Sequence, residues 1–146
     1  MNPMVKLFLG ANVVLFRATG GKIGSSMFGG RVLLLTTKGS KSGKNRTVPV
    51  MYFEDGRTRV VIASAGGSPV HPAWFKNLSQ FPGVTVEEKG RRYTARADIA
   101  VGKERARLWD KVVSEQPRFA EYAQKTKGRE IPVVVLNEAD PDTRPC

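Results

Sequence analysis

Cysteine and histidine are almost missing from this 146-residue sequence, which contains only Cys146 and His71. One cysteine excludes an internal disulfide, and these two residues give no cluster that could hold a catalytic metal. A serine or cysteine nucleophile also needs a base beside it, whereas His71 directly precedes Pro72 and is better interpreted as a helix cap or a surface residue. Metal-dependent and hydrolytic chemistry of these kinds is therefore not predicted.

Acidic residues and long apolar runs are also scarce. The sequence has 13 Asp and Glu against 24 Lys and Arg, and the net charge of +11 favours an anionic partner: nucleic acid, an anionic membrane surface or an acidic small molecule. Charged and glycine residues such as Lys6, Gly10 and Arg17 interrupt the apolar N-terminal run before the ~20 residues that a membrane span needs. Without a convincing signal-peptide cleavage site, we expect a cytoplasmic protein.

The N-terminal segment predicts a helix over residues 3–18, because Val5, Leu9 and Val13 repeat at helical spacing beside a second apolar stripe. We expect this helix to pack over the domain, and an interfacial membrane helix with peripheral membrane contact is the alternative. A glycine-rich linker follows up to residue 30, and residues 137–146 predict a loose tail. The whole chain, residues 1–146, is predicted to form one domain.

Between linker and tail, apolar runs alternate with turn signals. Residues 31–37, 46–53, 58–64, 84–89, 92–99 and 131–136 predict strands; residues 71–81, residues 103–115 and a segment from Pro117 predict helices. In the run 92–99, Tyr93, Ala95, Ala97 and Ile99 alternate with polar residues, which predicts one buried face. Tight turns predict antiparallel pairing, so we predict an α+β fold in which a small β-barrel is surrounded by helices.

A basic loop connects the first two predicted strands. Residues 36–49, TTKGSKSGKNRTVP, carry four cations, two glycines, two serines and no carboxylate. Such residues can hold a phosphate and further carboxylates through charge-assisted hydrogen bonds, although a solvated hairpin tip is the alternative. A Walker loop is excluded because Asn45 stands at the Ser or Thr position and a strand follows. An anion site without an evident acid, base or metal suits a protein that holds a reactive cofactor.

Three segments, LLTTKGSKSGKNRTVPVMYFEDG, VIASAGGSPVHPAWFKNL and REIPVVVL, resemble the deazaflavin-dependent nitroreductase family of mycobacteria and other actinobacteria over about residues 32–136. The resemblance implies a split β-barrel that binds coenzyme F420, a deazaflavin whose tail carries a phosphate and an oligoglutamate chain. It also implies an F420H2-dependent oxidoreductase that transfers a hydride to a lipophilic, electron-poor acceptor: a quinone, an activated enone or a nitroaromatic. The alternatives are a split-barrel oxidoreductase that binds flavin mononucleotide (FMN) and a non-catalytic F420 carrier.

The resemblance also implies roles for individual residues. It assigns the cofactor tail to Ser40, Lys41, Ser42 and Arg46, to which charge adds Lys38 and Lys44. The positions that would lie beside the rest of the cofactor are Thr47, Val48, Pro49, Val50, Met51, Ile62, Ala63, Ser64, Ala65, Ala73, Trp74, Phe75, Lys76 and Asn77. Ser64 would stabilise charge on the acceptor, and Tyr122 or water would donate a proton. The implied acceptor pocket consists of Met51, Trp74, Phe119 and Tyr122.

Packing roles remain open for several of these residues. Trp74 and Phe75 at helical spacing are often core residues, Tyr122 can pack on Phe119, and Ser64 can be an ordinary small barrel residue. The sequence also departs from the nitroimidazole-reducing member of the family: Met51, Gln116 and Phe119 replace tyrosines, and Ala65 replaces a lysine. A more apolar pocket and weak nitro-prodrug reduction are therefore expected.

The predicted partner is a small molecule. A nucleic-acid partner is not expected, because Tyr52, Phe53, Trp74 and Phe75 do not interleave with basic residues as a stacking platform would. The sequence gives no indication of oligomeric state.

Overall fold

A computed structural model describes residues 31–139 of the chain. The predicted N-terminal helix, the glycine-rich linker and residues 140–146 of the predicted tail lie outside the described residues. In chain order, the elements are β1 (Val32–Lys38), β2 (Asn45–Asp55), β3 (Thr58–Ile62), the 3-10 helix η2 (Ala65–Gly67), α2 (Ala73–Gln80), β4 (Gly83–Glu88), β5 (Arg91–Ile99), α3 (Gly102–Glu115), α4 (Arg118–Lys125) and β6 (Val133–Glu138).

The six strands form a closed barrel in the order β1-β2-β3-β6-β5-β4, and every neighbouring pair is antiparallel. The predicted barrel with surrounding helices is thus confirmed. Closure pairs both edges of each strand and removes the exposed sheet edges that favour aggregation. The β4–β5 turn accounts for the glycine at position 90. Lys89 and Gly90 both have positive φ, at 47° and 76°, as a type I′ turn requires.

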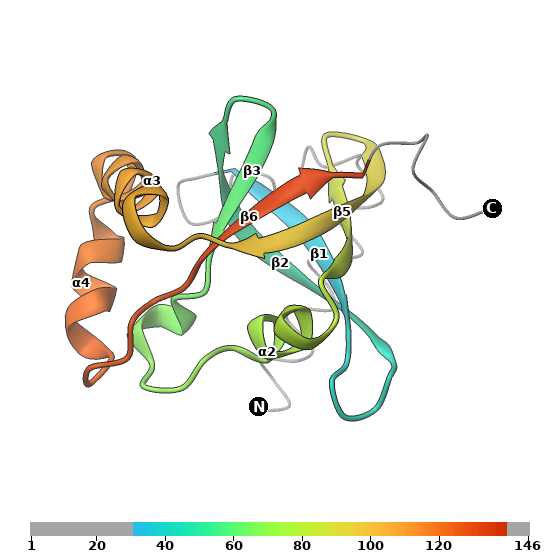
Figure 1. The fold of residues 1–146 in the computed structure, drawn as a ribbon, viewed down its shortest axis with the longest axis horizontal. Coiled ribbons are helices and arrows are strands. Elements are labelled where there is room, and N and C mark those ends of the chain that lie inside the picture. Colours follow the sequence, from blue (N-terminus) through green and yellow to red (C-terminus); the bar gives the residue numbers. More distant parts are fainter. Residues whose placement is uncertain (1–30, 140–146) are drawn as a thin grey trace.

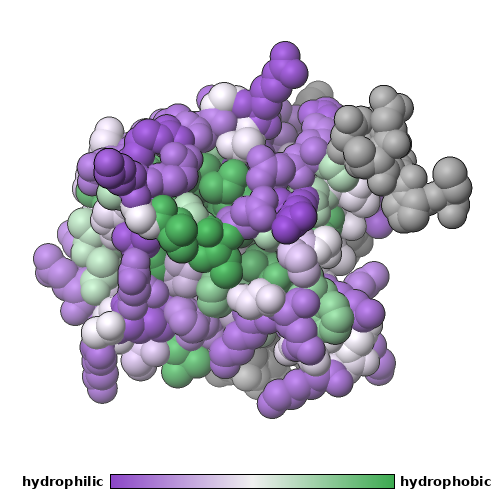
Figure 2. All heavy atoms as spheres, viewed as in Figure 1, coloured by the Kyte–Doolittle hydropathy of each residue, from purple (hydrophilic) through white to green (hydrophobic). Residues whose placement is uncertain are grey.

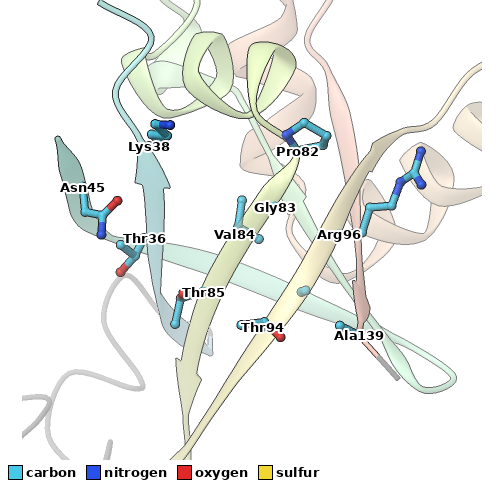
Figure 3. Close-up of a pocket in the computed structure, with 11 residues that line it drawn as sticks. Thr36, Lys38, Asn45, Pro82, Gly83, Val84, Thr85, Thr94, Arg96 and Ala139 are labelled. Carbon is cyan, nitrogen blue, oxygen red and sulfur yellow. The ribbon is translucent and has the colours of Figure 1, made fainter. Parts of the chain in front are cut away.

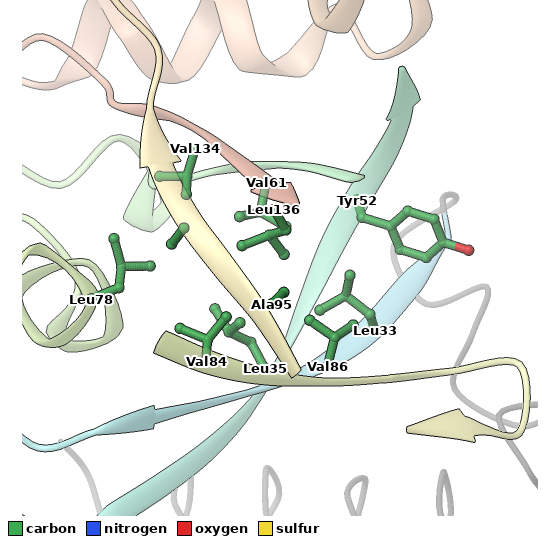
Figure 4. Packing of buried hydrophobic residues seen from close by; sticks show 11 residues of the cluster. Leu33, Leu35, Tyr52, Val61, Leu78, Val84, Val86, Ala95, Val134 and Leu136 are labelled. Carbon is green, nitrogen blue, oxygen red and sulfur yellow. The ribbon is translucent and has the colours of Figure 1, made fainter. Parts of the chain in front are cut away.

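Alternate residues of each strand fill the barrel interior. Figure 4 shows apolar side chains from all six strands converging there, with Leu78 of α2 beside them. On β2, for example, Val50 and Tyr52 belong to this interior cluster. Trp74 and Phe75 of α2 also pack against it, so α2 closes one end of the barrel.

A second apolar cluster lies on the outside of the barrel. Phe53, Ile62 and Val133 point outward and pack against Leu108 and Val112 of α3 and against Phe119 of α4. Figure 1 shows α3 and α4 on the same side of the barrel. The expected burial on β5 is correct for Ala95 and Ala97 but wrong for Ile99, which is 44% exposed. Ile99 ends β5 at the barrel rim, beyond the interior cluster.

The antiparallel order brings all the longer connections to one end of the barrel. β1, β3 and β5 end where β2, β6 and β4 begin, so the β1–β2 loop, residues 63–72 and α2 meet at that end, which we call the loop end. Figure 1 shows the β1–β2 loop, η2 and α2 at the bottom and the β2–β3 and β4–β5 turns at the top.

An ion pair closes the opposite end of the barrel. The guanidinium of Arg59 donates from Nε to both carboxylate oxygens of Glu88, each at 3.0 Å, and Glu88 is only 2% exposed. The Arg59 guanidinium also lies 5.5 Å from the ring centre of Tyr52. Burial, together with the Glu88 charge, raises the pKa of Tyr93 to about 12. Because Glu88 is paired and hydrogen-bonded, its burial is tolerated at this end.

Much of the surface is hydrophilic, with some exposed apolar side chains. Figure 2 shows apolar residues gathered in the middle of the viewed face, framed by hydrophilic ones. Val70, Ile99 and Val101 are the large apolar residues exposed within residues 31–139. In that part of the chain, no helix is long and apolar enough to cross a membrane.

Candidate cofactor-binding site

The basic β1–β2 loop is folded by its own backbone. The Gly39 N–H donates to the Lys44 carbonyl at 2.8 Å, and the Gly43 N–H donates to the Gly39 carbonyl at 2.9 Å. Gly43 has a φ of 71°, which favours glycine, and a Cβ on Gly39 would lie 2.8 Å from Ser42 Oγ. The two glycines therefore allow the compact shape of the loop, while the basic side chains beside and between them, Lys38, Lys41 and Lys44, are exposed.

Asn77 of α2 anchors this loop through two side-chain hydrogen bonds. Its Oδ1 accepts the Ser40 N–H at 3.0 Å, and its Nδ2 donates to Thr37 Oγ1 at 3.0 Å. Asn77 is 6% exposed and Thr37 is 1% exposed, so these bonds replace water. The Asn77 side chain, assigned by resemblance to cofactor contact, is thus occupied in positioning the loop relative to α2.

The strand after the loop presents only alternate side chains to the outside. Thr47, Pro49 and Met51 face outward, because Val50 lies in the interior cluster and Met51 packs against the outer one. Thr47 Oγ1 lies 2.8 Å from Thr36 Oγ1 on neighbouring β1. Of the predicted run 47–51, Val48 and Val50 therefore point toward the interior, and a ligand on the outer face would meet the other three side chains.

Residues 62–68 form a tightly bent segment beside that strand. Ala65, Gly66 and Gly67 all have positive φ, at 48°, 64° and 87°, and Ser64 is 9% exposed. A Cβ on Gly67 would lie 2.9 Å from the Tyr122 carbonyl oxygen, so only glycine allows this approach to α4. The bend thus brings the two predicted catalytic residues, Ser64 and Tyr122, onto neighbouring segments.

Arg129 fixes the shape of this bend and was missed by sequence reasoning. Its Nε donates to the Ser68 carbonyl at 2.9 Å, Nη1 to the Ala63 carbonyl at 3.1 Å, and Nη2 to the Ser64 carbonyl at 2.8 Å. These contacts span more than 60 residues of chain, so no local pattern signals them. Arg129 belongs to the quoted motif REIPVVVL, which is the only signal that could have identified it.

His71 is a partner of Arg129. Its Nδ1 lies 2.9 Å from Arg129 Nη1, and its ring centre lies 4.8 Å from that of Phe75, with the two rings tilted by 45°. Burial, followed by the Arg129 charge, lowers the pKa of His71, so Nδ1 of the neutral ring can accept a hydrogen bond from the Arg129 Nη1–H. The prediction of a helix cap is wrong: Pro72 occupies the N-cap of α2, which has no side-chain cap bond.

The sequence model of the F420H(2)-dependent quinone reductase family matches residues 9–138, nearly the whole chain. The chain belongs to this family. An F420H(2)-dependent quinone reductase of Mycobacterium tuberculosis is 37% identical over 127 residues, which cover 84% of each chain. The predicted deazaflavin-dependent reductase family is thereby confirmed.

Solved structures support the same family and its fold. An F420-H2 dependent reductase is 38% identical and has a TM-score of 0.66, with 73% of this chain and 93% of that chain covered. A pyridoxamine 5′-phosphate oxidase from Listeria innocua shares only 12% identity, with a TM-score of 0.51 over 75% of this chain and 84% of that chain. The second likeness concerns the fold alone and confirms the predicted split β-barrel.

The donor groups of the loop fit the cofactor of an F420H2-dependent quinone reductase. Lys38, Lys41, Lys44 and Arg46 are exposed and offer ammonium and guanidinium donors, while Ser40 and Ser42 offer hydroxyls. No carboxylate occurs between residues 36 and 49 to compete for these donors. A phosphate and an oligoglutamate chain are the anions that such a donor set prefers. Within residues 31–139, no three His, Cys, Asp or Glu side chains gather as a metal site.

The predicted acceptor residues fall into two groups. Phe119 is 5% exposed and packs edge-to-face on Phe53 at 5.7 Å and on Tyr122 at 5.5 Å, and Met51 packs against the same outer cluster. Trp74 packs instead against the barrel interior from α2. The structure thus brings together three of the four predicted residues.

A pocket of about 340 Å³ beside α3 is lined by Met51 and Gln116, two positions where this quinone reductase departs from the nitroimidazole-reducing relative. Its other described lining residues are Arg31, Tyr52, Phe53, Glu54, Lys111 and Glu115. This pocket is partly charged, and the more apolar acceptor pocket expected from the sequence stays a prediction.

Proposed function

We propose that this member of the quinone reductase family holds F420H2 across the loop end of the barrel and reduces a quinone there. The family membership gives the F420H2-dependent oxidoreductase activity and the quinone as its class of acceptor. The observation that carries the site is the cationic β1–β2 loop, tied by Asn77 to α2 at the barrel end where residues 63–68 bend. Enones and nitroaromatics are further candidate acceptors, supported only by the same chemistry.

The tail of the cofactor is held by the exposed loop. Lys41, Ser42 and Arg46 would bind its phosphate, with Lys38 and Lys44 beside them. Because the loop is closed by its own hydrogen bonds, little ordering is needed when an anion binds. The outward-facing side chains of Thr47, Pro49 and Met51 lead along β2 to Ile62 and residues 63–65. We assign the deazaflavin ring to that position.

The reaction needs a hydride and a proton to reach the quinone. The bound coenzyme supplies the hydride from C5 of its reduced deazaflavin ring. Residues 63–68, fixed by Arg129, would orient the ring and place the Ser64 hydroxyl and nearby backbone N–H groups close to the developing oxyanion. The Tyr122 phenol, held edge-on by Phe119, would donate the proton to the quinone oxygen.

The test combines binding and turnover. The full chain is titrated with F420 and, separately, with FMN, and F420H2 oxidation by menadione is then followed in a stopped-flow instrument. We expect F420 to bind and FMN to remain unbound, with quinone-dependent oxidation of F420H2. Tight F420 binding without oxidation by any quinone would instead favour the carrier function, and FMN binding alone would overturn the proposal.

A further inference from the structure

Four threonines form a straight row across the outside of four neighbouring strands. Thr47 pairs with Thr36, Thr36 with Thr85, and Thr85 with Thr94, across β2, β1, β4 and β5. Their chain neighbours Leu35, Val86 and Ala95 lie in the interior cluster, so the threonines face outward. This row begins on the strand that we assign to the cofactor and leads away from the ring position.

A groove of about 560 Å³ lies over three of these threonines, Thr36, Thr85 and Thr94. Figure 3 shows Thr36, Thr85 and Thr94 on adjacent strands, with Lys38 and Asn45 at one side and Arg96 at the other. Lys38 and Asn45 flank the basic loop, so the groove starts where that loop ends. Among the described residues that line it, none carries a carboxylate and none is aromatic.

We infer that this groove binds the oligoglutamate chain of F420 beyond the basic loop. The inference rests on the proposed function, since the loop must first hold the phosphate. Lys38 and Arg96 would bind the glutamate carboxylates, while the threonine hydroxyls and the Asn45 amide would bond to carboxylates and amides of the chain. The lack of aromatic lining residues disfavours a nucleic acid, whose bases need stacking partners.

The dimensions limit how much of the chain the groove can hold. Two gaps between neighbouring strands separate Thr36 from Thr94, which is about 10 Å at the usual strand spacing. An extended peptide covers that distance with about three residues, and a γ-linked chain needs fewer. Affinity should therefore rise over the first few glutamates and then become constant.

Arg96 is the most informative residue to change. Its Nε lies 3.3 Å from Asp98 Oδ1, but the two side chains are 74% and 49% exposed, so this pair is weak and leaves other guanidinium donors available. An exposed contact of this kind changes binding by about threefold to fivefold. Arg57, exposed in the β2–β3 turn at the opposite end of the barrel, provides a control with the same loss of charge.

The experiment measures the affinity of the full-length chain for F420 without glutamates, with a short tail and with a long tail, by coenzyme fluorescence. For the unsubstituted protein we expect tighter binding of the longer forms. Arg96→Gln should lose about threefold to fivefold in affinity for the long form and nothing for the form without glutamates, whereas Arg57→Gln should keep the wild-type ratio. Higher salt should reduce the preference for long tails.

Three other outcomes separate this inference from the proposed function. If no form of F420 binds, the proposed function fails. If all forms bind with equal affinity, the proposed function stands and the groove assignment is overturned. If Arg96→Gln weakens every form equally, or if Arg57→Gln matches it, the effect is one of net charge and the assignment is again overturned. Unchanged thermal unfolding of both variants checks that each is folded.

Discussion

Replacing Arg129 by lysine tests whether one guanidinium holds the bend at residues 63–68. Lysine keeps the charge, but its single nitrogen cannot reach three carbonyl groups that now accept from Nε, Nη1 and Nη2. At least two charge-assisted bonds are lost, at about 1.5 kcal/mol or more each, so the unfolding free energy should fall by about 3 kcal/mol or more. Against a typical total of about 5–15 kcal/mol, the protein should stay folded.

The same substitution should separate orientation from binding. Arg129 contacts residues 63–68 and His71, and the β1–β2 loop depends on Asn77 instead. In Arg129→Lys we therefore expect hydride transfer to a quinone to slow by about tenfold or more, with the affinity for F420 nearly unchanged. Urea unfolding measures the loss of stability, and single-turnover stopped-flow at saturating coenzyme measures the slower hydride transfer.

A control and a refuting result complete this experiment. Arg57→Lys makes the same chemical change at an exposed turn and should alter neither stability nor rate. If Arg129→Lys unfolds at the wild-type urea concentration and turns over at the wild-type rate, the guanidinium does not position the bend. An equal loss of F420 affinity and of hydride-transfer rate would indicate that Arg129 contacts the cofactor directly.

Four further substitutions test the other assignments. Lys41→Ala and Arg46→Ala should each weaken F420 binding by about 1–3 kcal/mol in fluorescence titrations; wild-type affinity in both would refute the tail assignment. The pKa of His71 is lowered in the folded protein, so the unfolded chain binds its proton first and stability should decline as pH falls from about 6.5 toward the folded value. His71→Gln should remove that decline from chemical unfolding curves, and an unchanged pH profile would contradict it. Glu88→Gln removes the buried charge that pairs with Arg59 and, among the described carboxylates, leaves that guanidinium only Glu54 Oε1 at 3.9 Å, so it should cost about 3 kcal/mol in urea unfolding, with little change in F420 affinity; wild-type stability would show that the pair is dispensable.

Local sequence patterns predicted the strands and helices well, because burial on alternate residues is a local property. The run 92–99 shows both the strength and the limit of this reasoning: Ala95 and Ala97 are buried, but Ile99 is exposed because the strand ends at the rim. The basic loop was also visible in the sequence, since charge and glycine content need no tertiary information.

Contacts that depend on strand order could not be predicted. Thr37 and Asn77 are 40 residues apart and meet only because α2 closes the end of the barrel where β1 ends. The four threonines look unrelated in the sequence and align only through the register of three strand pairs. The Arg129 contacts likewise join the start of the last strand region to the end of β3.

The closed antiparallel barrel explains why anchor and reaction site can be separate parts of one rigid body. β1 and β3 end at the same rim on either side of β2, so the loop after β1 and the bend after β3 lie at one end of the barrel, with β2 between them. Each is then fixed by a different side chain, the loop by the buried Asn77 and the bend by the half-buried Arg129. Because these anchors share no hydrogen bond among the described residues, changes at one should add to changes at the other in free energy. Tail affinity and hydride transfer can therefore be altered independently in this barrel.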